Sequence, residues 1–297
     1  MDKPYTSPLL YPGGKRWLFP ILLDLLPPFQ EMVSPFMGGG SIELNFAAHG
    51  KHIYGYDTCP HLCNFWRHWL KYSLEIQIKA KETLKEHLDD PEVLSQIKQA
   101  ETSINFDKSL LVFEEFYLWR AVYYYLFNRL SFQGLTYKTS SIKPYYFNEK
   151  EFDFFFNHNE MMRTRRLFPQ VNRIRFIEYD LLNISIEQQD YEKTLTQNEI
   201  LAYCDPPYYK IESLYASQGF DHKKLAEILH SRDNWVLSYN DVPFIHELYA
   251  GYPKKPVKMT SGFRKDGKRQ KKIELLIFSH DIYDYIQQPQ PQQLQLL

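Results

Sequence analysis

Cysteine is scarce in this sequence, and its scarcity excludes several classes of protein. The 297 residues include 3 cysteines, Cys59, Cys63 and Cys204, too few for a disulfide framework, so we expect a reducing compartment, the cytoplasm. Long apolar runs are also missing. The most apolar stretch, residues 17–29, contains an aspartate and three prolines and is too broken to span a bilayer. The N-terminal segment has no signal-peptide core, and we expect no membrane partner.

Net charge is nearly absent as well. The chain carries 35 Lys and Arg against 36 Asp and Glu, a formal charge of −1, so only local clusters can indicate a charged partner. Two clusters rich in Lys and Arg, residues 163–175 and 254–274, lie beside strand-like runs. Basic runs are often plain solvated surface. Two that flank strands of one sheet fit contacts with nucleic-acid phosphates better.

The apolar residues that are present alternate between strand-sized runs and segments of helical period, which predicts an α/β fold. A block of helical pattern, residues 61–130, interrupts this alternation. Residues 287–297 are rich in Gln and Pro, and we expect a disordered tail there. The other expected elements are helix 16–26, a strand, glycine turn and helix over 31–50, strand 51–57, strand 173–180, strand 199–205, helix 222–231, strand 234–241 and strand 272–280.

Two glycine-containing segments near the N-terminus are typical of ligand-binding loops. SPFMGGGS, residues 34–41, lies between an expected strand and helix, so its backbone can approach a ligand closely. Asp57 ends the next strand, where a carboxylate can hold a ribose hydroxyl. Glu43 occupies the third glycine position of a dinucleotide fingerprint, and YPGGKR, residues 11–16, lacks two residues of a phosphate loop. A structural turn and a generic surface loop remain the alternatives.

The sharpest signal is DPPY, residues 205–208, which directly follows a short apolar run. Prolines cannot continue a central strand, and each fixes φ, so the turn is stiff and its carbonyl groups are held in place. Asp205 stands at the carboxyl end of the strand, where open α/β sheets bind ligands. The carboxylate, the Pro206 carbonyl and the flat ring of Tyr208 together make a seat for a planar base with an exocyclic amine.

The pattern Cys59-x-His61-x-Cys63 has the spacing of a metal site but offers only three candidate ligands. No second cysteine pair accompanies it, and the signature of the zinc deaminases is absent from the sequence. We therefore expect no metal ion, and we interpret this segment as the partly buried start of a helix.

Together these segments resemble the Dam-type DNA adenine-N6 methyltransferases (D12 class, alpha group), over nearly the whole chain except the tail. Asp57 is similar to the ribose-binding acid of that family, and DPPY to its catalytic motif. The resemblance implies a Rossmann-like methyltransferase sheet, residues 1–60 and 166–286, with an inserted helical target-recognition domain, residues 61–165. The other matching segments are YPGGKR, SPFMGGGS, NRLSFQGL (128–135) and GKRQKKIELLIF (267–278).

The resemblance implies methyl transfer from S-adenosylmethionine to the N6 amine of adenine in a short site of double-stranded DNA, by a monomer. Asp205 and the Pro206 carbonyl would accept the two N6 hydrogens, and the flipped-out base would stack on Tyr208. Positioning and electrostatics would supply most of the acceleration. The residues implied at the cofactor are Tyr11, Lys15, Phe36, Gly38, Gly39, Gly40, Ser41, Asp57, Asp180 and Asp205.

The same resemblance implies two groups of DNA contacts. The amides of Asn128 and Gln133 can pair with the major-groove edge of adenine, and Arg129 with guanine. GATC-reading members of the family have GFNGL where this chain has SFQGL, so the target sequence is open, as is the choice between an orphan, restriction-modification or phage enzyme. The implied contact residues are Asn128, Arg129, Phe132, Gln133, Lys268, Arg269, Lys271 and Lys272.

Two other functions remain open at this point. N4 methylation of cytosine presents the same two amine hydrogens, and mass spectrometry of modified nucleosides separates the two reactions. A DNA-binding regulator could have kept the fold and lost turnover, although the intact Gly40, Asp205, Pro206 and Tyr208 argue against it. A titration with the cofactor tests this third possibility.

Replacing Gln133 by Ala is expected to relax the choice of site. The rate on the preferred sequence should fall more than the rate on near-cognate sequences, because a correct pair contributes about 1–3 kcal/mol against the wrong base. Methylation rates on a panel of duplexes measure this difference. A uniform loss on all sites would mean that Gln133-Gly134 is a structural turn and that Asn128 caps the preceding helix.

Overall fold

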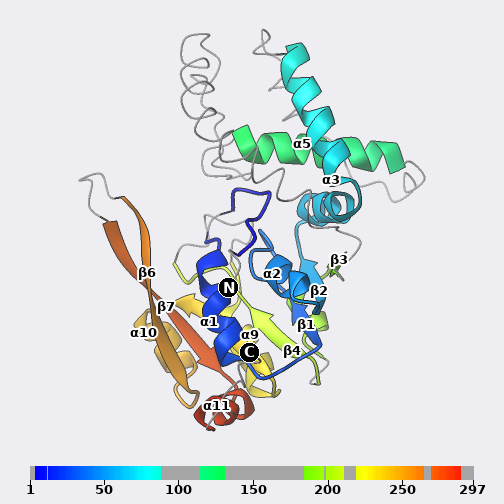
Figure 1. The fold of residues 1–297 in the computed structure, drawn as a ribbon. Coiled ribbons are helices and arrows are strands. Elements are labelled where there is room, and N and C mark those ends of the chain that lie inside the picture. Colours follow the sequence, from blue (N-terminus) through cyan, green and yellow to red (C-terminus); the bar gives the residue numbers. More distant parts are fainter. Residues whose placement is uncertain are drawn as a thin grey trace, which may run out of the picture.

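The computed structural model describes residues 4–11, 13–87, 114–130, 184–196, 199–210, 219–263 and 269–288. The strands among them form one seven-stranded sheet in the order β3-β2-β1-β4-β5-β7-β6 (Figure 1). The neighbours from β3 to β5 are parallel, and β7 runs antiparallel to both β5 and β6. The strands are β1 (Glu31–Ser34), β2 (His52–Asp57), β3 (Ile184–Gln188), β4 (Leu201–Cys204), β5 (Trp235–Asn240), β6 (Lys254–Phe263) and β7 (Arg269–Phe278).

The order of the strands creates a switch point between β1 and β4. From β1 the chain continues outward to β2 and β3, whereas β4 and β5 extend the sheet in the opposite direction. Loops that leave two parallel strands on either side of such a point diverge, which opens a crevice at the carboxyl ends of the strands. The loop after β1 and the DPPY turn after β4 both border this crevice.

Both faces of the sheet are buried, which explains why its central strands are continuous apolar runs. Alternate residues of β4 pack into different cores: Leu201 and Tyr203 into the first, Ala202 and Cys204 into the second. The helices on the first core are η1 (Arg16–Leu18), α1 (Phe19–Leu25), α2 (Glu43–Ala48), α3 (Pro60–His87), α5 (Glu114–Leu130) and α11 (His280–Gln287). Those on the second core are α8 (Tyr191–Thr194), α9 (His222–His230) and α10 (Pro243–Leu248).

Local chemistry sets several of these boundaries. α1 ends where Leu26 turns extended ahead of Pro27-Pro28, because the residue before a proline disfavours the helical conformation. The Asp221 carboxylate accepts a hydrogen bond from the backbone N–H of Lys224 and so caps α9. In β6, at the edge of the sheet, Pro256 and the neighbouring lysines disfavour pairing with another chain.

The helical block contributes α3 and α5 (Glu114–Leu130), which pack against each other. α3 begins inside the first core, where Phe65, Trp66 and Trp69 are fully buried. At Tyr72 its backbone leaves helical geometry, with φ −131° and ψ 33°, and its later part stands with α5 above the sheet (Figure 1). The predicted domain boundary at residue 61 therefore lies within packed core, and the division into domains stays a prediction.

The expected α/β fold with a mostly parallel sheet is confirmed. The structure adds β3, β6, α8, α10 and α11, which the sequence pattern did not indicate, and the expected strand 173–180 and the tail lie outside the described residues. The sequence pattern did not indicate β6 because three of its first five residues, 254–258, are lysines and a fourth is proline, which resembles a basic loop. Among the helices that the structure describes, none is long and apolar enough to cross a membrane.

Candidate active site

The glycine loop, residues 35–42 between β1 and α2, is held between two aromatic side chains. Trp66 donates its indole N–H to the carbonyl oxygen of Gly38 at 2.9 Å. A Cβ atom on Gly40, whose φ is +62°, would lie 2.8 Å from the Trp66 ring, and one on Gly38, whose φ is +47°, would lie 2.8 Å from the Tyr11 ring. The loop therefore needs glycine at both positions to pass this close to the two rings.

Asp57, at the end of β2, fixes the other side of the glycine loop. Its carboxylate accepts hydrogen bonds from the backbone N–H of Gly38, at 3.1 Å, and of Cys59, at 2.9 Å. Burial raises the pKa of Asp57, and these two hydrogen bonds oppose the rise because they stabilise the charged form. Each carboxylate oxygen has a second lone pair, so Asp57 can also accept a hydrogen bond from a ligand hydroxyl.

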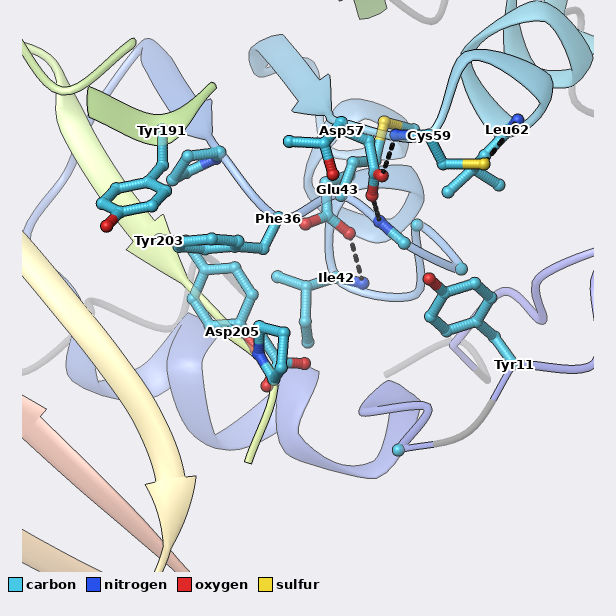
Figure 2. Close-up of a pocket in the computed structure, with 18 of the residues that line it drawn as sticks. Tyr11, Phe36, Ile42, Glu43, Asp57, Cys59, Leu62, Tyr191, Tyr203 and Asp205 are labelled. Carbon is cyan, nitrogen blue, oxygen red and sulfur yellow. Dashed lines mark hydrogen bonds between the residues drawn. The ribbon is translucent and has the colours of Figure 1, made fainter. Parts of the chain in front are cut away.

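A cavity of about 330 Å³ lies beside the glycine loop (Figure 2). One wall is aromatic: the ring centroids of Phe36 and Tyr191 lie 5.4 Å apart, and that of Phe220 lies 5.6 Å from Phe36. All the residues predicted at a cofactor, except Asp180, line this cavity: Tyr11, Lys15, Phe36, Gly38, Gly39, Gly40, Ser41, Asp57 and Asp205. The fold therefore brings segments from four parts of the chain to one hollow.

Glu43, in the first turn of α2, places a buried carboxyl group at the same cavity (Figure 2). It accepts hydrogen bonds from the Ser34 hydroxyl, at 2.6 Å, and from the Ile42 backbone N–H, at 3.2 Å. Burial raises the pKa of Glu43 to about 7; the Ser34 hydrogen bond opposes this rise, and the negative charge of Asp205 adds to it. The sequence pattern marked Glu43 only as a missing glycine.

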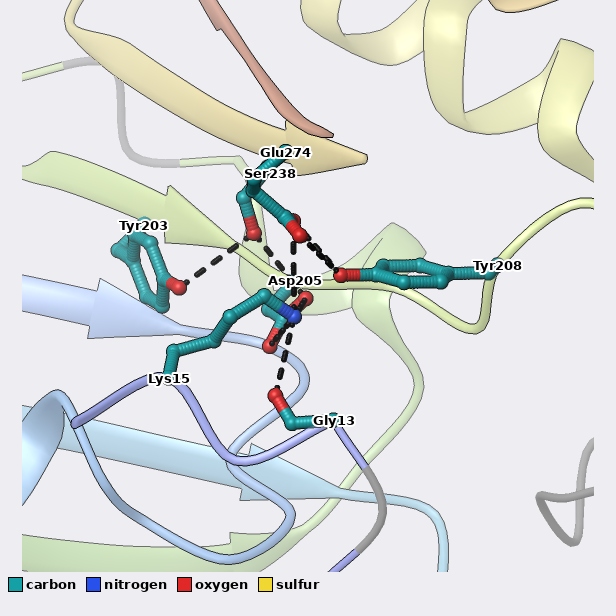
Figure 3. Close-up of polar contacts among 7 residues, drawn as sticks. All are labelled: Gly13, Lys15, Tyr203, Asp205, Tyr208, Ser238 and Glu274. Atoms are coloured by element: carbon teal, nitrogen blue, oxygen red, sulfur yellow. Dashed lines mark hydrogen bonds and ion pairs between the residues drawn. The ribbon is translucent and has the colours of Figure 1, made fainter. Parts of the chain in front are cut away.

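At the carboxyl end of β4, Lys15 and Asp205 form an ion pair (Figure 3). Lys15 Nζ lies 2.9 Å from Asp205 Oδ1 and 3.1 Å from Oδ2, and it also donates to the Gly13 carbonyl at 3.1 Å. The Ser238 hydroxyl, from β5, donates to the same Oδ1 at 3.1 Å. The Lys15 side chain is 4% exposed and that of Asp205 is 23% exposed. The Asp205 carboxylate is therefore fixed by buried protein donors and still has a surface that a ligand can reach.

A second carboxylate approaches the same ammonium group. Glu274 Oε1, in β7, lies 3.6 Å from Lys15 Nζ, and the two Glu274 oxygens accept the Tyr208 hydroxyl at 2.7 and 2.6 Å. Lys15 Nζ also lies 4.6 Å from the centroid of the Tyr208 ring, within the range of a cation–π interaction. Burial raises the pKa of Glu274 to about 7; the charge of Lys15 opposes this rise, and that of Asp205 adds to it.

Comparison with known proteins identifies the reaction that this arrangement serves. The family profile of D12 class N6 adenine-specific DNA methyltransferases matches residues 11–262. The chain belongs to this class. It is also similar to two proteins named DNA adenine methylase, from the Classical Ogawa and El Tor Inaba strains of Vibrio cholerae serotype O1. Each is 26% identical over 294 residues, which cover 91% of this chain and 94% of the relative.

The family and the names of its relatives confirm a site-specific DNA methyltransferase that acts on N6 of adenine. They decide between the two amines considered above, because the class is specific for adenine. Methyl transfer from S-adenosylmethionine and extrusion of the target base follow from membership of the family.

The acid predicted at the adenine end of the cofactor of this methyltransferase, Asp180, lies outside the described residues. The acid that follows the third parallel strand is Asp190, which lines the cavity and caps α8 by accepting from the backbone N–H of Glu192 at 3.2 Å. The apolar pattern of the sequence did not indicate this strand, β3, because it is an edge strand in which only Ile186 is buried. The sequence signal for β3 was a short alternation of apolar and polar residues, 184–188, just before Asp190-Tyr191.

Asn128, predicted to read a base, has a different setting in the methyltransferase. Its side chain is fully buried in α5. Its amide oxygen accepts from the Leu10 N–H, and its amide nitrogen donates to the Leu10 carbonyl, each at 2.8 Å. The side chain joins α5 to the N-terminal segment and presents no surface to DNA. The base contact and the helix cap considered for Asn128 stay predictions beside this observed contact with Leu10.

The other DNA contacts stay predictions. Those on described backbone are Arg129 in α5 and Arg269, Lys271 and Lys272 in β7. Those outside the described residues are Phe132, Gln133 and Lys268.

Side chains of the Cys59-x-His61-x-Cys63 segment form hydrogen bonds with other groups of the protein. His61 Nδ1 accepts from the Arg120 guanidinium at 3.0 Å, and the Cys63 thiol donates to the Asp57 carbonyl at 3.4 Å. All three cysteines of the chain are buried thiols. Within the described ranges, no group of three or more His, Cys, Asp or Glu side chains could hold a metal ion.

The buried carboxyl group of Glu43 is expected to make the stability of the methyltransferase depend on pH. Its pKa is raised from 4.5 to about 7, so the folded state keeps a proton that the unfolded state loses, and the free energy of unfolding falls as pH rises from about 4.5 to 7. This single group accounts for a fall of up to about 3 kcal/mol. Glu43→Gln should remove that part of the slope and unfold at higher urea concentration than the native protein at pH 8.

Urea unfolding at pH 5 and pH 8 measures this effect. Glu75→Gln is the matched control, because Glu75 is an exposed carboxylate on α3. Equal slopes in the native protein and Glu43→Gln would show that Glu43 is ionised in the folded state at neutral pH.

Proposed function

We propose that this methyltransferase binds S-adenosylmethionine in the cavity beside the glycine loop and methylates an adenine held at the DPPY turn. The observation that carries the proposal is that the glycine loop, Asp57 and Asp205, far apart in the chain, line one cavity. Open α/β sheets bind their ligands in the crevice at the carboxyl ends of the strands, which is where these groups meet. Methyl donor and acceptor would therefore be adjacent.

The residues around the cavity suit the parts of this cofactor. The Asp57 carboxylate can accept hydrogen bonds from the ribose hydroxyls, and the aromatic wall formed by Phe36, Tyr191 and Phe220 suits a purine ring. Asp190, on the same wall, is an acceptor for the exocyclic amine of that ring. The glycines at 38–40 let the loop that borders the cavity pack directly against the rings of Tyr11 and Trp66. When bound, S-adenosylmethionine supplies an electrophilic methyl group on a sulfonium.

Asp205 and the carbonyl of Pro206 would act on the nucleophile. The N6 lone pair of adenine is delocalised into the ring, and acceptors for both N6 hydrogens favour the pyramidal amine, whose lone pair points at the methyl group. Asp205 Oδ1 accepts from both Lys15 and Ser238, whereas Oδ2 accepts from Lys15 at 3.1 Å, so Oδ2 is the oxygen better placed to take an N6 hydrogen and to hold the proton that N6 loses. Because these contacts exist before DNA binds, the acceptor is preorganised.

The proposed substrate surface comprises Tyr208 and the basic β6–β7 hairpin. A base inside a duplex cannot reach Asp205, so the target adenine would leave the helix and stack on the Tyr208 ring. The hairpin would contact phosphates of double-stranded DNA, and the helical block around α5 would read the short site. We propose a cytoplasmic monomer for this activity.

Asp205→Ala is expected to abolish methyl transfer, with a fall in turnover of at least about 1,000-fold, because the acceptor that orients N6 is lost. The protein should still fold and keep much of its DNA binding, because Glu274 remains 3.6 Å from the Lys15 ammonium group. Transfer of a labelled methyl group from S-adenosylmethionine to DNA measures the rate, with Asp233→Ala in the turn before β5 as the control. Substantial turnover by Asp205→Ala would remove Asp205 from the mechanism.

Neutralising Lys268, Arg269, Lys271 and Lys272 together is expected to weaken binding to DNA of any sequence. It should also flatten the salt dependence, since each lost phosphate contact lowers the slope of log K against log salt by about 0.9. Binding titrations at several salt concentrations measure the slope. The control replaces Lys223 and Lys224 of α9 by Gln. An unchanged slope would identify the four hairpin residues as solvated surface.

A further inference from the structure

Glu274 is a buried acid that directly precedes the apolar, core-filling half of β7. The residues that follow it in β7, from Leu275 to Phe278, are all buried, and Glu274 itself is 4% exposed. It faces Asn240 of β5 and Val257 of β6 in the sheet. Burying a carboxylate costs several kcal/mol before any partner compensates, and an apolar residue at such a position is often more stable. The fold alone therefore gives no reason for a glutamate here.

The contacts of Glu274 point to the DPPY turn. Both of its oxygens accept the hydroxyl of Tyr208, at 2.7 and 2.6 Å, and Oε1 lies 3.6 Å from Lys15 Nζ (Figure 3). A hydrogen bond to a charged acceptor is stronger than one between neutral groups. The Tyr208 ring is thus fixed at two ends, by the rigid prolines at its backbone and by Glu274 at its hydroxyl.

We infer that Glu274 is a positioning residue that sets the plane of the Tyr208 ring on which the target adenine stacks. The inference rests on the proposed role of Tyr208 as the base-stacking surface. A stacked base follows the plane of the ring beneath it, and a displacement of about 1 Å at the reacting atom is enough to lower a rate about 100-fold. Glu274 touches neither cofactor nor base; it acts through the tyrosine hydroxyl.

The position of Glu274 in the chain extends this role. β7 runs from Arg269 to Phe278, so one strand contains both the basic residues proposed to contact phosphates and the carboxylate that holds Tyr208. Arg269 lies five positions before Glu274 in this continuous strand. The same rigid strand would thereby position both the DNA backbone, through the basic residues, and the extruded base, through Tyr208.

A double-mutant cycle between Glu274 and Tyr208 tests the inference. Glu274→Leu removes the acceptor with an apolar residue suited to a buried strand, and Tyr208→Phe removes the hydroxyl while keeping the ring. Each is expected to lower kcat by about 10- to 100-fold, with the KM for S-adenosylmethionine within about twofold of the native value. The double variant should be no slower than the slower single variant, because both changes break one contact. Glu274→Gln, which keeps an acceptor, should recover part of the rate.

A spectroscopic measurement separates ring positioning from general damage. Sequencing of methylated DNA first defines the site, and 2-aminopurine then replaces its target adenine. Glu274→Leu and Tyr208→Phe should shift the fluorescence of the bound duplex in the same direction, while Glu227→Gln, an exposed carboxylate on α9, should not. The unfolding midpoint of each variant shows whether it folds. If Glu274→Leu does not fold, Glu274→Gln in the native and Tyr208→Phe backgrounds completes the double-mutant cycle in its place.

Three outcomes would overturn the inference. Multiplicative effects of the two substitutions would show that Glu274 acts independently of the Tyr208 hydroxyl, and a raised KM for S-adenosylmethionine would show that it acts through Lys15 on the cofactor. Native kcat in both single variants would show that the contact is dispensable. Tyr208→Ala distinguishes this last failure from failure of the proposed function: loss of activity there leaves Tyr208 as the stacking surface, whereas native activity removes it from that role.

Discussion

One ammonium group, that of Lys15, lies between two carboxylates at the carboxyl end of the sheet, and the active site is arranged around it. Lys15 comes from the N-terminal segment, Asp205 from the end of β4 and Glu274 from β7. A lone charge of either sign would be costly at such low exposure, so each group depends on the others. The triad therefore ties three distant parts of the chain to a single geometry, and both the DPPY turn and the ring of Tyr208 depend on it.

In the proposed reaction, this arrangement would let one crevice hold two different ligands. The glycine loop, held by Trp66 and Asp57, leaves space on one side, and the ion triad fixes hydrogen-bond acceptors on the other. Neither side needs to be rebuilt when a ligand arrives, so little reorganisation opposes the reaction. The pKa values of Glu43 and Glu274 are both raised for the same reason, because both carboxyl groups are buried beside this crevice.

The fold and the motif residues were accessible from sequence because they depend on local patterns. Apolar runs that end at Asp57 and Asp205 predicted parallel strands, and the strand order places both acids at one edge. Glu274 was not singled out because its role depends on a neighbour 66 residues away in the chain. The contact of Asn128 was inaccessible for a similar reason: its amide suits a base edge equally well, and its partner Leu10 lies 118 residues away in the chain. Apolar patterns in the sequence predict helices and strands, whereas the partners of polar side chains are known only from the tertiary structure.

The contact between Asn128 and Leu10 has a consequence for exchanging parts between relatives. Leu10 is followed directly by Tyr11, whose ring packs on the glycine loop, so the helical block is attached to the methyl-donor side by two consecutive residues. A chimaera that takes its helical block from another family member would bring a foreign residue against Leu10 unless the donor also supplies the first dozen residues. An exchange meant to transfer the proposed sequence preference would therefore need two pieces of the chain, the helical block and the shorter N-terminal segment.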